Sequence, residues 1–262
     1  MVRRRFGRLS VHPNIGQHLI KKKRVFDLLF SQEILEFKTK NGETLQTAVY
    51  YCKYFELLRD KLLMERGLEE SEMEDHFGID SGKNSLKVIY NLVYKYSCKD
   101  REKRLFNLKG SRQSIVILCV EGVNEARENI EQVWKLLDLK SYNRPHVIET
   151  DLKLVNIILG IGTHASTMPC PYCTARKVNK QEWSRGDSRT FQSLKDYYEK
   201  WILDGSYKEK RKLFGSVEAR SLLCPLDLSI LVILMIPPPP LHLIKLGKAD
   251  RFILAFEFLI KT

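Results

Sequence analysis

The stretches HFGID at residues 76–80 and HVIETD at residues 146–151 are two apolar, strand-like runs, and each ends in an aspartate. Turn-forming residues, SGKN, follow the first run and lead into a second β-rich run, SLKVIY, at residues 85–90. If the two aspartate-bearing strands are neighbours in one sheet, Asp80 and Asp151 meet at one edge. Carboxylates side by side repel each other unless a proton or a cation joins them. The pair therefore predicts a shared divalent cation, or else two separate structural roles, a turn for Asp80 and a helix cap for Asp151.

The residues around these runs predict a mixed α/β domain. Residues 114–120 are apolar on both faces and predict a central strand. Residues 125–137 carry apolar side chains at helical spacing, and residues 152–161 predict a buried helix that Gly160 ends. The predicted order over 71–163 is therefore β-β-β-α-β-α. Consecutive strands favour antiparallel pairing, whereas a strand reached through a helix favours a parallel, right-handed crossover.

The region before this core is basic, and its clearest pattern is helical. Residues 45–66 place apolar side chains at three-to-four spacing, which predicts one amphipathic helix that ends at Gly67. Residues 69–75 have the composition of an acidic linker. The basic clusters at residues 3–5 and 21–24 are typical of nucleic-acid contact or nuclear import, and also of a solvated tail.

Composition favours a polyanionic partner. The 262 residues include 44 Lys and Arg against 32 Asp and Glu, a formal net charge of +12. Such an excess favours nucleic acid, although a lysine-rich surface also serves solubility. Six cysteines in a chain of this length do not make a secreted disulfide scaffold. The apolar run at residues 228–236 is shorter than the roughly 20 residues of a membrane helix and ends in prolines, so we expect no membrane span.

A cysteine pair appears after Gly162, where the chain changes character. Cys170 and Cys173 have the C-x2-C spacing at which one turn can place two thiolates on a metal. A structural zinc site needs about four ligands. The residues that could complete it are His164, His242 and Cys224. Two alternatives stay open: buried cysteines without a metal, and a thioredoxin-like redox pair, although this pair does not follow a strand and open a helix.

Residues 176–212 interleave lysine and arginine with aromatic side chains. That combination is typical of a surface that follows phosphates and stacks bases. The spacing of Tyr197, Tyr198 and Trp201 also suits the buried face of a helix, which is the alternative use of these rings.

Four stretches of the chain together resemble a group of transposon-derived proteins that are abundant in some invertebrate genomes. They are FGIDSGKNSLKV, SIVILCVEGVNEARENIEQVWKLL, ETDLKLVNIILGIGTHASTMPCPYC and IPPPPLHLIKLG, and they lie within roughly residues 45 to 250. This group is similar to ribonuclease H-like DNA transposases. The resemblance implies an α/β fold with a ribonuclease H-like mixed sheet and a zinc-knuckle-like insertion.

The same resemblance implies roles for individual residues. Asp80 and Asp151 match the catalytic acids on the first and fourth strands of such a sheet. The cysteine pair and a downstream histidine of the group are matched by Cys170, Cys173 and His242. The implied cofactors are Mg²⁺ or Mn²⁺ at the aspartates and a structural Zn²⁺ at the cysteines. DNA is the implied partner. The basic clusters favour a nuclear location, with the cytoplasm as the alternative.

Two features depart from the group's pattern. The turn after Asp80 is SGKN where a glycine-rich stretch is expected. A third catalytic acid is expected on a late helix beyond the insertion, and Glu257, the only late acid in a helical setting, is not marked as its match. We therefore expect a basic region at 1–70, a partial ribonuclease H-like core at 71–163 and a truncated cysteine/histidine region at 164–262.

The expected function is that of a transposase-derived nucleic-acid-binding protein that has lost strand-transfer activity. One alternative is a non-catalytic, zinc-stabilised module that binds DNA or protein. Another is a sugar-kinase-like fold in which Asp80 opens a phosphate loop, but the chain lacks a second glycine-rich loop for the phosphates.

Overall fold

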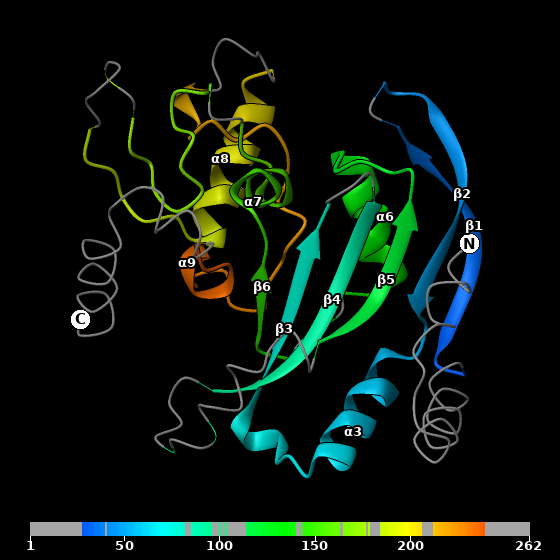
Figure 1. The fold of residues 1–262 in the computed structure, drawn as a ribbon. Coiled ribbons are helices and arrows are strands. Elements are labelled where there is room, and N and C mark those ends of the chain that lie inside the picture. The colour runs from blue at the N-terminus through cyan, green and yellow to red at the C-terminus, as the bar shows by residue number, and fades with distance from the viewer. Residues whose placement is uncertain are drawn as a thin grey trace, which may run out of the picture.

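The described residues form one six-stranded mixed sheet with helices packed against it (Figure 1). The strands are β1 (Phe30–Lys38), β2 (Thr44–Cys52), β3 (Met73–Asp80), β4 (Ser85–Tyr94), β5 (Ile115–Glu121) and β6 (His146–Glu149). Their order across the sheet is β1-β2-β5-β4-β3-β6. All neighbouring strands are antiparallel except β3 and β6, which are parallel. This computed structural model describes residues 28–238 apart from 40, 82–84, 96–99, 101–102, 104–113, 140–141, 143, 163–164, 177, 179–183 and 206–211.

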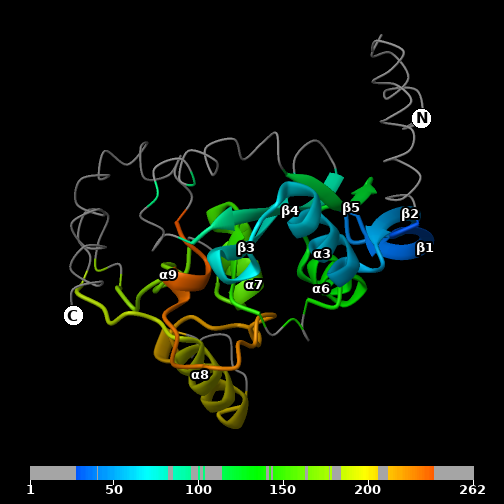
Figure 2. The same ribbon diagram turned by 90° about the horizontal axis from the view of Figure 1, so that it is seen from below.

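The helices of the described residues are short. They are α3 (Phe55–Arg66), the 3-10 turn η2 (Glu70–Glu72), α6 (Arg127–Leu136), α7 (Leu152–Leu159), α8 (Phe191–Leu203) and α9 (Val232–Met235). Seen from below, α3, α6 and α7 lie on one side of the sheet, while α8 and α9 gather beyond its β6 edge (Figure 2). Across the described part of the chain, no helix has both the length and the apolar character needed to cross a bilayer.

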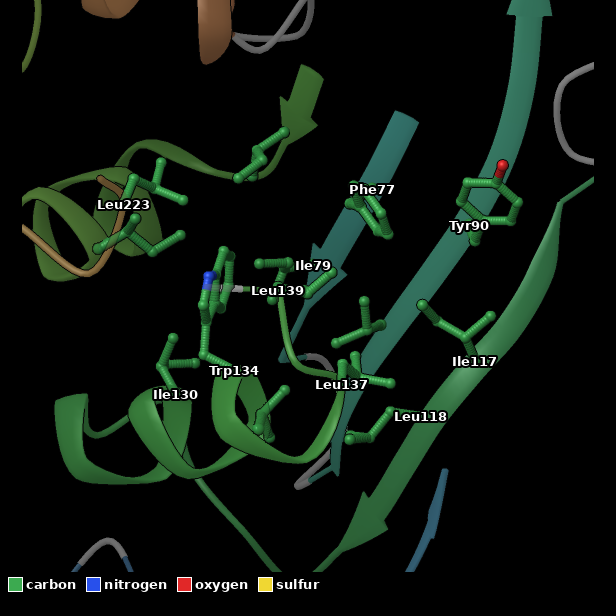
Figure 3. Packing of buried hydrophobic residues seen from close by; sticks show 14 of the residues in the cluster. Phe77, Ile79, Tyr90, Ile117, Leu118, Ile130, Trp134, Leu137, Leu139 and Leu223 are labelled. Carbon is green, nitrogen blue, oxygen red and sulfur yellow. The ribbon is translucent and has the colours of Figure 1, made fainter. Parts of the chain in front are cut away.

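The core lies between the sheet and these helices (Figure 3). Alternate residues of β3 point into it, and Phe77 and Ile79 are buried there. Trp134 and Ile130 project from α6 toward Ile79, so the apolar stripe of this helix covers the middle of the sheet (Figure 3). The period-two pattern of the strand and the helical period of α6 thus meet in one buried layer.

The predicted order of elements from residue 71 to 163 is confirmed. β3, β4 and β5 form an antiparallel meander, and α6 carries the chain across to β6, which pairs in parallel with β3. The helix boundaries differ slightly, because α6 begins at Arg127 and α7 ends at Leu159 ahead of the left-handed Gly160.

The predicted helix over 45–66 is wrong in its first half. Residues Thr44–Cys52 form β2, and only Phe55–Arg66 is helical, with left-handed Gly67 after it as expected. Apolar residues at 45, 49 and 52 fit a helical period, but the β-branched and aromatic residues between them favour the extended chain. The strand β1 pairs with all of β2. It was not predicted, because the residues before about 45 are mixed in period and favour no single element.

The acidic linker predicted at 69–75 is also wrong. The segment contains η2 and the start of β3, and its last residue, Asp75, is only 2% exposed. Asp75 sits in an inward-facing position of β3 and accepts hydrogen bonds from Arg59, Tyr90 and Tyr142. The carboxylate of Asp75 therefore belongs to the core and not to a solvent-exposed linker.

Candidate functional site

The carboxyl ends of β3, β5 and β6 lie at the same end of the sheet (Figure 1). β5 is antiparallel to β4, β4 is antiparallel to β3, and β3 is parallel to β6, so three strands run in one direction. In such sheets the loops beyond the carboxyl ends collect functional side chains.

Asp80 and Asp151 occupy this end of the sheet. The parallel ladder closes with Gly78 opposite Glu149, and each aspartate lies two residues further along its own strand direction. Thr150 Oγ1 donates a 2.9 Å hydrogen bond to the carbonyl of Ile79, which keeps the two chains together beyond the ladder. Neighbouring strands are about 4.8 Å apart. The backbone therefore brings the two aspartates to adjacent positions, and both residues are exposed.

One oxygen of Asp151 has a structural role. Asp151 is the N-cap of α7, and its Oδ1 accepts a 2.8 Å hydrogen bond from the backbone N–H of Leu154. A cap of this kind stabilises a helix by about 1 kcal/mol. The structural use that the sequence allowed for Asp151 is thus real, and it leaves the second carboxylate oxygen, Oδ2, outside the cap.

Glu125 is a third acid at this end of the sheet, and the sequence pattern did not reveal it. It lies in the loop between β5 and α6, where the sequence placed it merely as the first residue of a helix. Its Oε2 accepts a hydrogen bond from the hydroxyl of Ser81, and its Oε1 forms an ion pair with Lys153. Ser81 comes directly after Asp80, and Lys153 comes two residues after Asp151. Through these two contacts Glu125 connects the end of β3 with the end of β6. The shared direction of β3, β5 and β6 is the signal that could have found it.

These acids do not form a closed metal cage. Within the residues that the structure describes, no group of three or more His, Cys, Asp or Glu side chains is arranged to hold a metal ion. Glu125 is neutralised by Lys153 instead. The arrangement can attract a cation between Asp80 and Asp151, with Lys153 as the competing positive charge.

A charged contact fixes β6 beside β3 next to this site. His76 Nδ1 lies 2.8 Å from Glu149 Oε1, and its Nε2 lies 3.4 Å from Glu74 Oε2. Burial alone would lower the pKa of His76, but its hydrogen bonds to Glu149 and Glu74 outweigh burial and raise that pKa to about 9. His76 is therefore a cation at neutral pH. It holds Glu149, which precedes Asp151 by two residues, beside β3.

Cys170 and Cys173 form the second candidate site. Both are partly buried free thiols. Hydrogen bonding between their two side chains raises the pKa of Cys170 and lowers that of Cys173. Backbone hydrogen bonds from Tyr172 and Cys173 act to lower the pKa of Cys170, and one from Ala175 acts to lower that of Cys173.

A buried arginine holds this cysteine loop. Arg189 is 1% exposed, and its Nε donates to the carbonyls of Cys170 and Cys173 at 3.0 and 3.1 Å. Its Nη2 donates to the carbonyls of Met168 and Gly215 at 3.3 and 2.7 Å. One guanidinium thus fixes both ends of the C-x2-C turn. Nothing in the sequence separates Arg189 from the other basic residues of its segment.

The other predicted zinc ligands are not brought to the pair by the part of the chain that is described. His164 and His242 lie outside the described residues. Cys224 is exposed. Two sulfurs with backbone N–H donors suit a soft metal such as zinc, so the pair fits half of a structural site.

The basic, aromatic segment is only partly a surface. Phe191 and Leu194 of α8 are buried, and Tyr197 and Tyr198 pack against the core. For Tyr197 and Tyr198 the alternative given by the helical spacing therefore applies: these rings contribute to the core. The basic clusters at residues 3–5 and 21–24 lie outside the described residues.

Comparison of the chain with protein-family models, with curated proteins and with solved structures finds no match.

Proposed function

We propose that this chain is a ribonuclease H-like, nucleic-acid-binding domain of DNA transposase ancestry. The observation that carries the proposal is the position of Asp80 at the end of β3 and of Asp151 just beyond the end of β6, the adjacent parallel strand. The chain order β3-β4-β5-α6-β6, with β6 next to β3, agrees with the predicted order of elements and with the predicted adjacency of the two aspartate-bearing strands. A fold alone does not give a function, so the proposal rests on these acids and on the charge of the chain.

Asp80 and Asp151 would hold one divalent cation, Mg²⁺ or Mn²⁺, at the strand ends. Carboxylate oxygens are the ligands that these ions prefer, and the ion would supply positive charge for a phosphodiester oxygen. Asp151 would use Oδ2, because Oδ1 accepts the hydrogen bond from Leu154. Glu125 could approach the same ion only by giving up its ion pair with Lys153.

The proposal is for binding without strand cleavage. Two-metal phosphodiester chemistry needs carboxylates that hold two ions about 3.5–4 Å apart. Among the described residues no such group of three ligands exists, and Glu125 is occupied by Lys153. A single ion between Asp80 and Asp151 would orient a phosphate but would leave the leaving oxygen without its own ion. The domain is thus proposed as a remnant of a strand-transfer enzyme, with nuclear DNA as its partner.

The cysteine pair would contribute a structural zinc ion. Cys170 and Cys173 supply two sulfurs on a turn that Arg189 already fixes. His164 and His242 are the proposed remaining ligands. A non-catalytic, zinc-stabilised DNA- or protein-binding module is the second candidate, and the capping role of Asp151 favours it, because a capping carboxylate needs no metal.

DNA binding by the full-length chain should be strongly salt-dependent and should strengthen with Mg²⁺. With a net charge of +12, release of counterions should lower affinity by about 10³-fold or more between about 50 and 200 mM salt. Fluorescence anisotropy of a labelled duplex, at matched ionic strength with Mg²⁺ or EDTA, measures both effects. No nicked or joined strands should appear with Mg²⁺ or Mn²⁺.

A double variant, Asp80→Asn with Asp151→Asn, should bind DNA equally with and without Mg²⁺. Asparagine keeps the cap of α7, so the fold is preserved. The matched control is Asp60→Asn, an exposed aspartate of α3. Binding that is absent or indifferent to salt would contradict the nucleic-acid role. Unchanged Mg²⁺ dependence in the double variant would contradict the metal site, and metal-dependent nicking lost in this variant would show an active enzyme.

Zinc should co-purify with the full-length chain in about one equivalent, and the double variant Cys170→Ser with Cys173→Ser should contain none. Elemental analysis after gel filtration measures the metal content. Cys119→Ser, which removes a thiol from β5, is the control and should retain the metal. A wild-type chain without zinc would refute this part of the proposal and leave the DNA result untouched.

A further inference from the structure

We propose that the chain forms a homodimer in which the outer edges of two β1 strands pair antiparallel about Ile34 and join two six-stranded sheets into one. The proposal does not rest on the proposed DNA or zinc binding. It follows from three features of the described residues: an open edge of the sheet, backbone groups that face outward along this edge, and side chains that match those of a second copy.

The two edges of the sheet differ in their protection. At one edge, β6 has only four residues, and α8 and α9 gather beyond it (Figure 2). At the other edge, β1 has nine residues, and no described strand pairs with its outer side. The register of β1 with β2 runs from Phe30 to Lys38 without a bulge, and β1 contains no proline. A long edge without these protective features is a template for pairing with another strand.

Alternate residues of β1 turn their backbone N–H and C=O groups outward. The carbonyl of Leu29 accepts a 2.9 Å hydrogen bond from the N–H of Lys53, at the end of β2. At the other end of the strand, the N–H of Thr39 donates a 2.8 Å hydrogen bond to the carbonyl of Glu43. In an antiparallel pair, the residues between such bonded positions face away from the partner strand. The residues whose backbone groups face outward are therefore Phe30, Gln32, Ile34, Glu36 and Lys38.

A side chain of α6 covers the last of these outward positions. The N–H of Lys38 donates a 2.7 Å hydrogen bond to Oδ1 of Asn129, and its carbonyl accepts a 2.7 Å hydrogen bond from Nδ2 of the same side chain. These two bonds confirm the outward direction of the even-numbered residues. Within the described residues, the positions from Phe30 to Glu36 have no comparable cover, so the open part of the edge is centred near the middle of the strand.

The side chains of β1 match a second copy when Ile34 lies on the two-fold axis. Each Ile34 then faces the other, and each Gln32 faces Glu36 of the second copy. Ile34 is 71% exposed in the single chain, where its neighbour on β2 is the small Ala48. Pairing removes this apolar side chain from water, and the amide of Gln32 can donate a hydrogen bond to the carboxylate of Glu36.

Charge favours this register over two of its neighbours. A pair centred on Glu33 or on Glu36 would place that carboxylate directly opposite its own copy, which destabilises an antiparallel pair. With Ile34 on the axis, Glu33 faces Leu35 instead. Glu33 is also held by its own chain, since the hydroxyl of Tyr51 donates a hydrogen bond to it. The register is therefore self-complementary in charge as well as in apolar contact.

Sedimentation equilibrium of the full-length chain should give about twice the 30.7 kDa of one chain. Ile34→Lys should lower the mass to that of one chain, because two ammonium groups would face each other at the axis. Met64→Lys is the matched control, since it adds the same charge at a 78% exposed apolar position of α3 and should stay dimeric. Far-UV circular dichroism checks that both variants fold. A wild-type chain with the mass of a monomer at every soluble concentration, or a folded Ile34→Lys variant that stays dimeric, would overturn the proposal.

Cysteine cross-linking tests the register without a variant that breaks the dimer. Residues that face each other in a hydrogen-bonded antiparallel pair have Cα atoms about 5.5 Å apart, which suits a disulfide. Ile34→Cys should therefore form a covalent dimer under mild oxidation, and peptide mapping should place the bond between the two copies of residue 34. Gln32→Cys is the control, because its two copies lie about 14 Å apart in this register and should not be linked. No bond at residue 34, or a bond from Gln32→Cys alone, would overturn the register. Neither assay measures DNA or zinc, so the dimer and the proposed function can fail separately.

Discussion

Replacing Asp75 with alanine should lower the free energy of unfolding by about 3–5 kcal/mol, the usual cost of leaving one partner of a buried ion pair alone. Asp75 and Arg59 are each 2% exposed. Arg59 Nε lies 3.0 and 3.2 Å from the two oxygens of Asp75. The hydroxyls of Tyr90 and Tyr142 donate to the same carboxylate at 2.5 and 2.6 Å. Alanine would leave Nε of the buried Arg59 and the hydroxyls of Tyr90 and Tyr142 without the carboxylate that accepts from them.

Urea unfolding of the variant and of the wild type measures this loss. The control is Asp60→Ala, which removes an exposed carboxylate from the same helix as Arg59 and should change stability by less than about 0.5 kcal/mol. The double variant Arg59→Met with Asp75→Leu should recover part of the loss, because apolar residues of similar volume can replace a buried pair. A loss for Asp75→Ala no larger than that of the control would show that water satisfies this network.

The same network helps to position the acids of the candidate site. Arg59 also pairs with Glu70 at 2.9 Å, and Arg144, in the segment that leads into β6, pairs with Glu70 too. Tyr142 of that segment packs edge-on against Phe55 and Phe77. α3, β3 and the approach to β6 are therefore joined at the end of the sheet opposite Asp80 and Asp151. Because β6 has only four residues, its register against β3 depends on such contacts.

The sequence predicted the central elements because their patterns are unambiguous. β3, β4, β5 and β6 are rich in β-branched and aromatic residues between clear turns, and α6 has one apolar stripe. The pattern at 45–66 was ambiguous, because apolar residues at 45, 49 and 52 fit both a strand and a helix. Local patterns also describe which residues are apolar, not which charges are buried, so Asp75 in its acidic run was misassigned.

For the candidate sites, the sequence predicted individual residues but not the contacts between residues that lie far apart in the chain. The positions of Asp80 and Asp151 follow from strand ends and pairing, which the sequence pattern implies. The contacts of Glu125 depend on the loop after β3, the loop after β5 and the first turn of α7, which come together in space, and no local spacing encodes them. Arg189 donates hydrogen bonds to the carbonyls of a cysteine turn whose last residue, Cys173, lies 16 residues earlier in the chain. Contacts of this kind need the fold before they can be recognised.

Replacing Gly160 with alanine should lower the free energy of unfolding by about 2–4 kcal/mol, from a left-handed backbone and a steric clash together. Gly160 ends α7 with φ of +69°. A Cβ atom there would lie 2.1 Å from the carbonyl oxygen of Ala219 and 2.6 Å from its carbonyl carbon. The two chains cannot simply move apart, because the carbonyl of Gly160 accepts hydrogen bonds from the N–H groups of Glu218 and Ala219 at 2.7 and 3.1 Å.

Gly67→Ala is the matched control for this prediction, because Gly67 also ends a helix in the left-handed region, at φ of +62°, and a Cβ atom there would meet nothing within 4 Å. It carries the backbone cost of about 1 kcal/mol without the clash. The difference between the two variants in urea unfolding isolates the contact between α7 and the segment at 215–219. That contact joins the cysteine region to the helix that Asp151 caps, so alkylation of Cys170 and Cys173 should also become faster in Gly160→Ala and not in Gly67→Ala. Equal losses of stability, with unchanged alkylation in both, would mean that the cysteine region is not anchored to the sheet through Gly160.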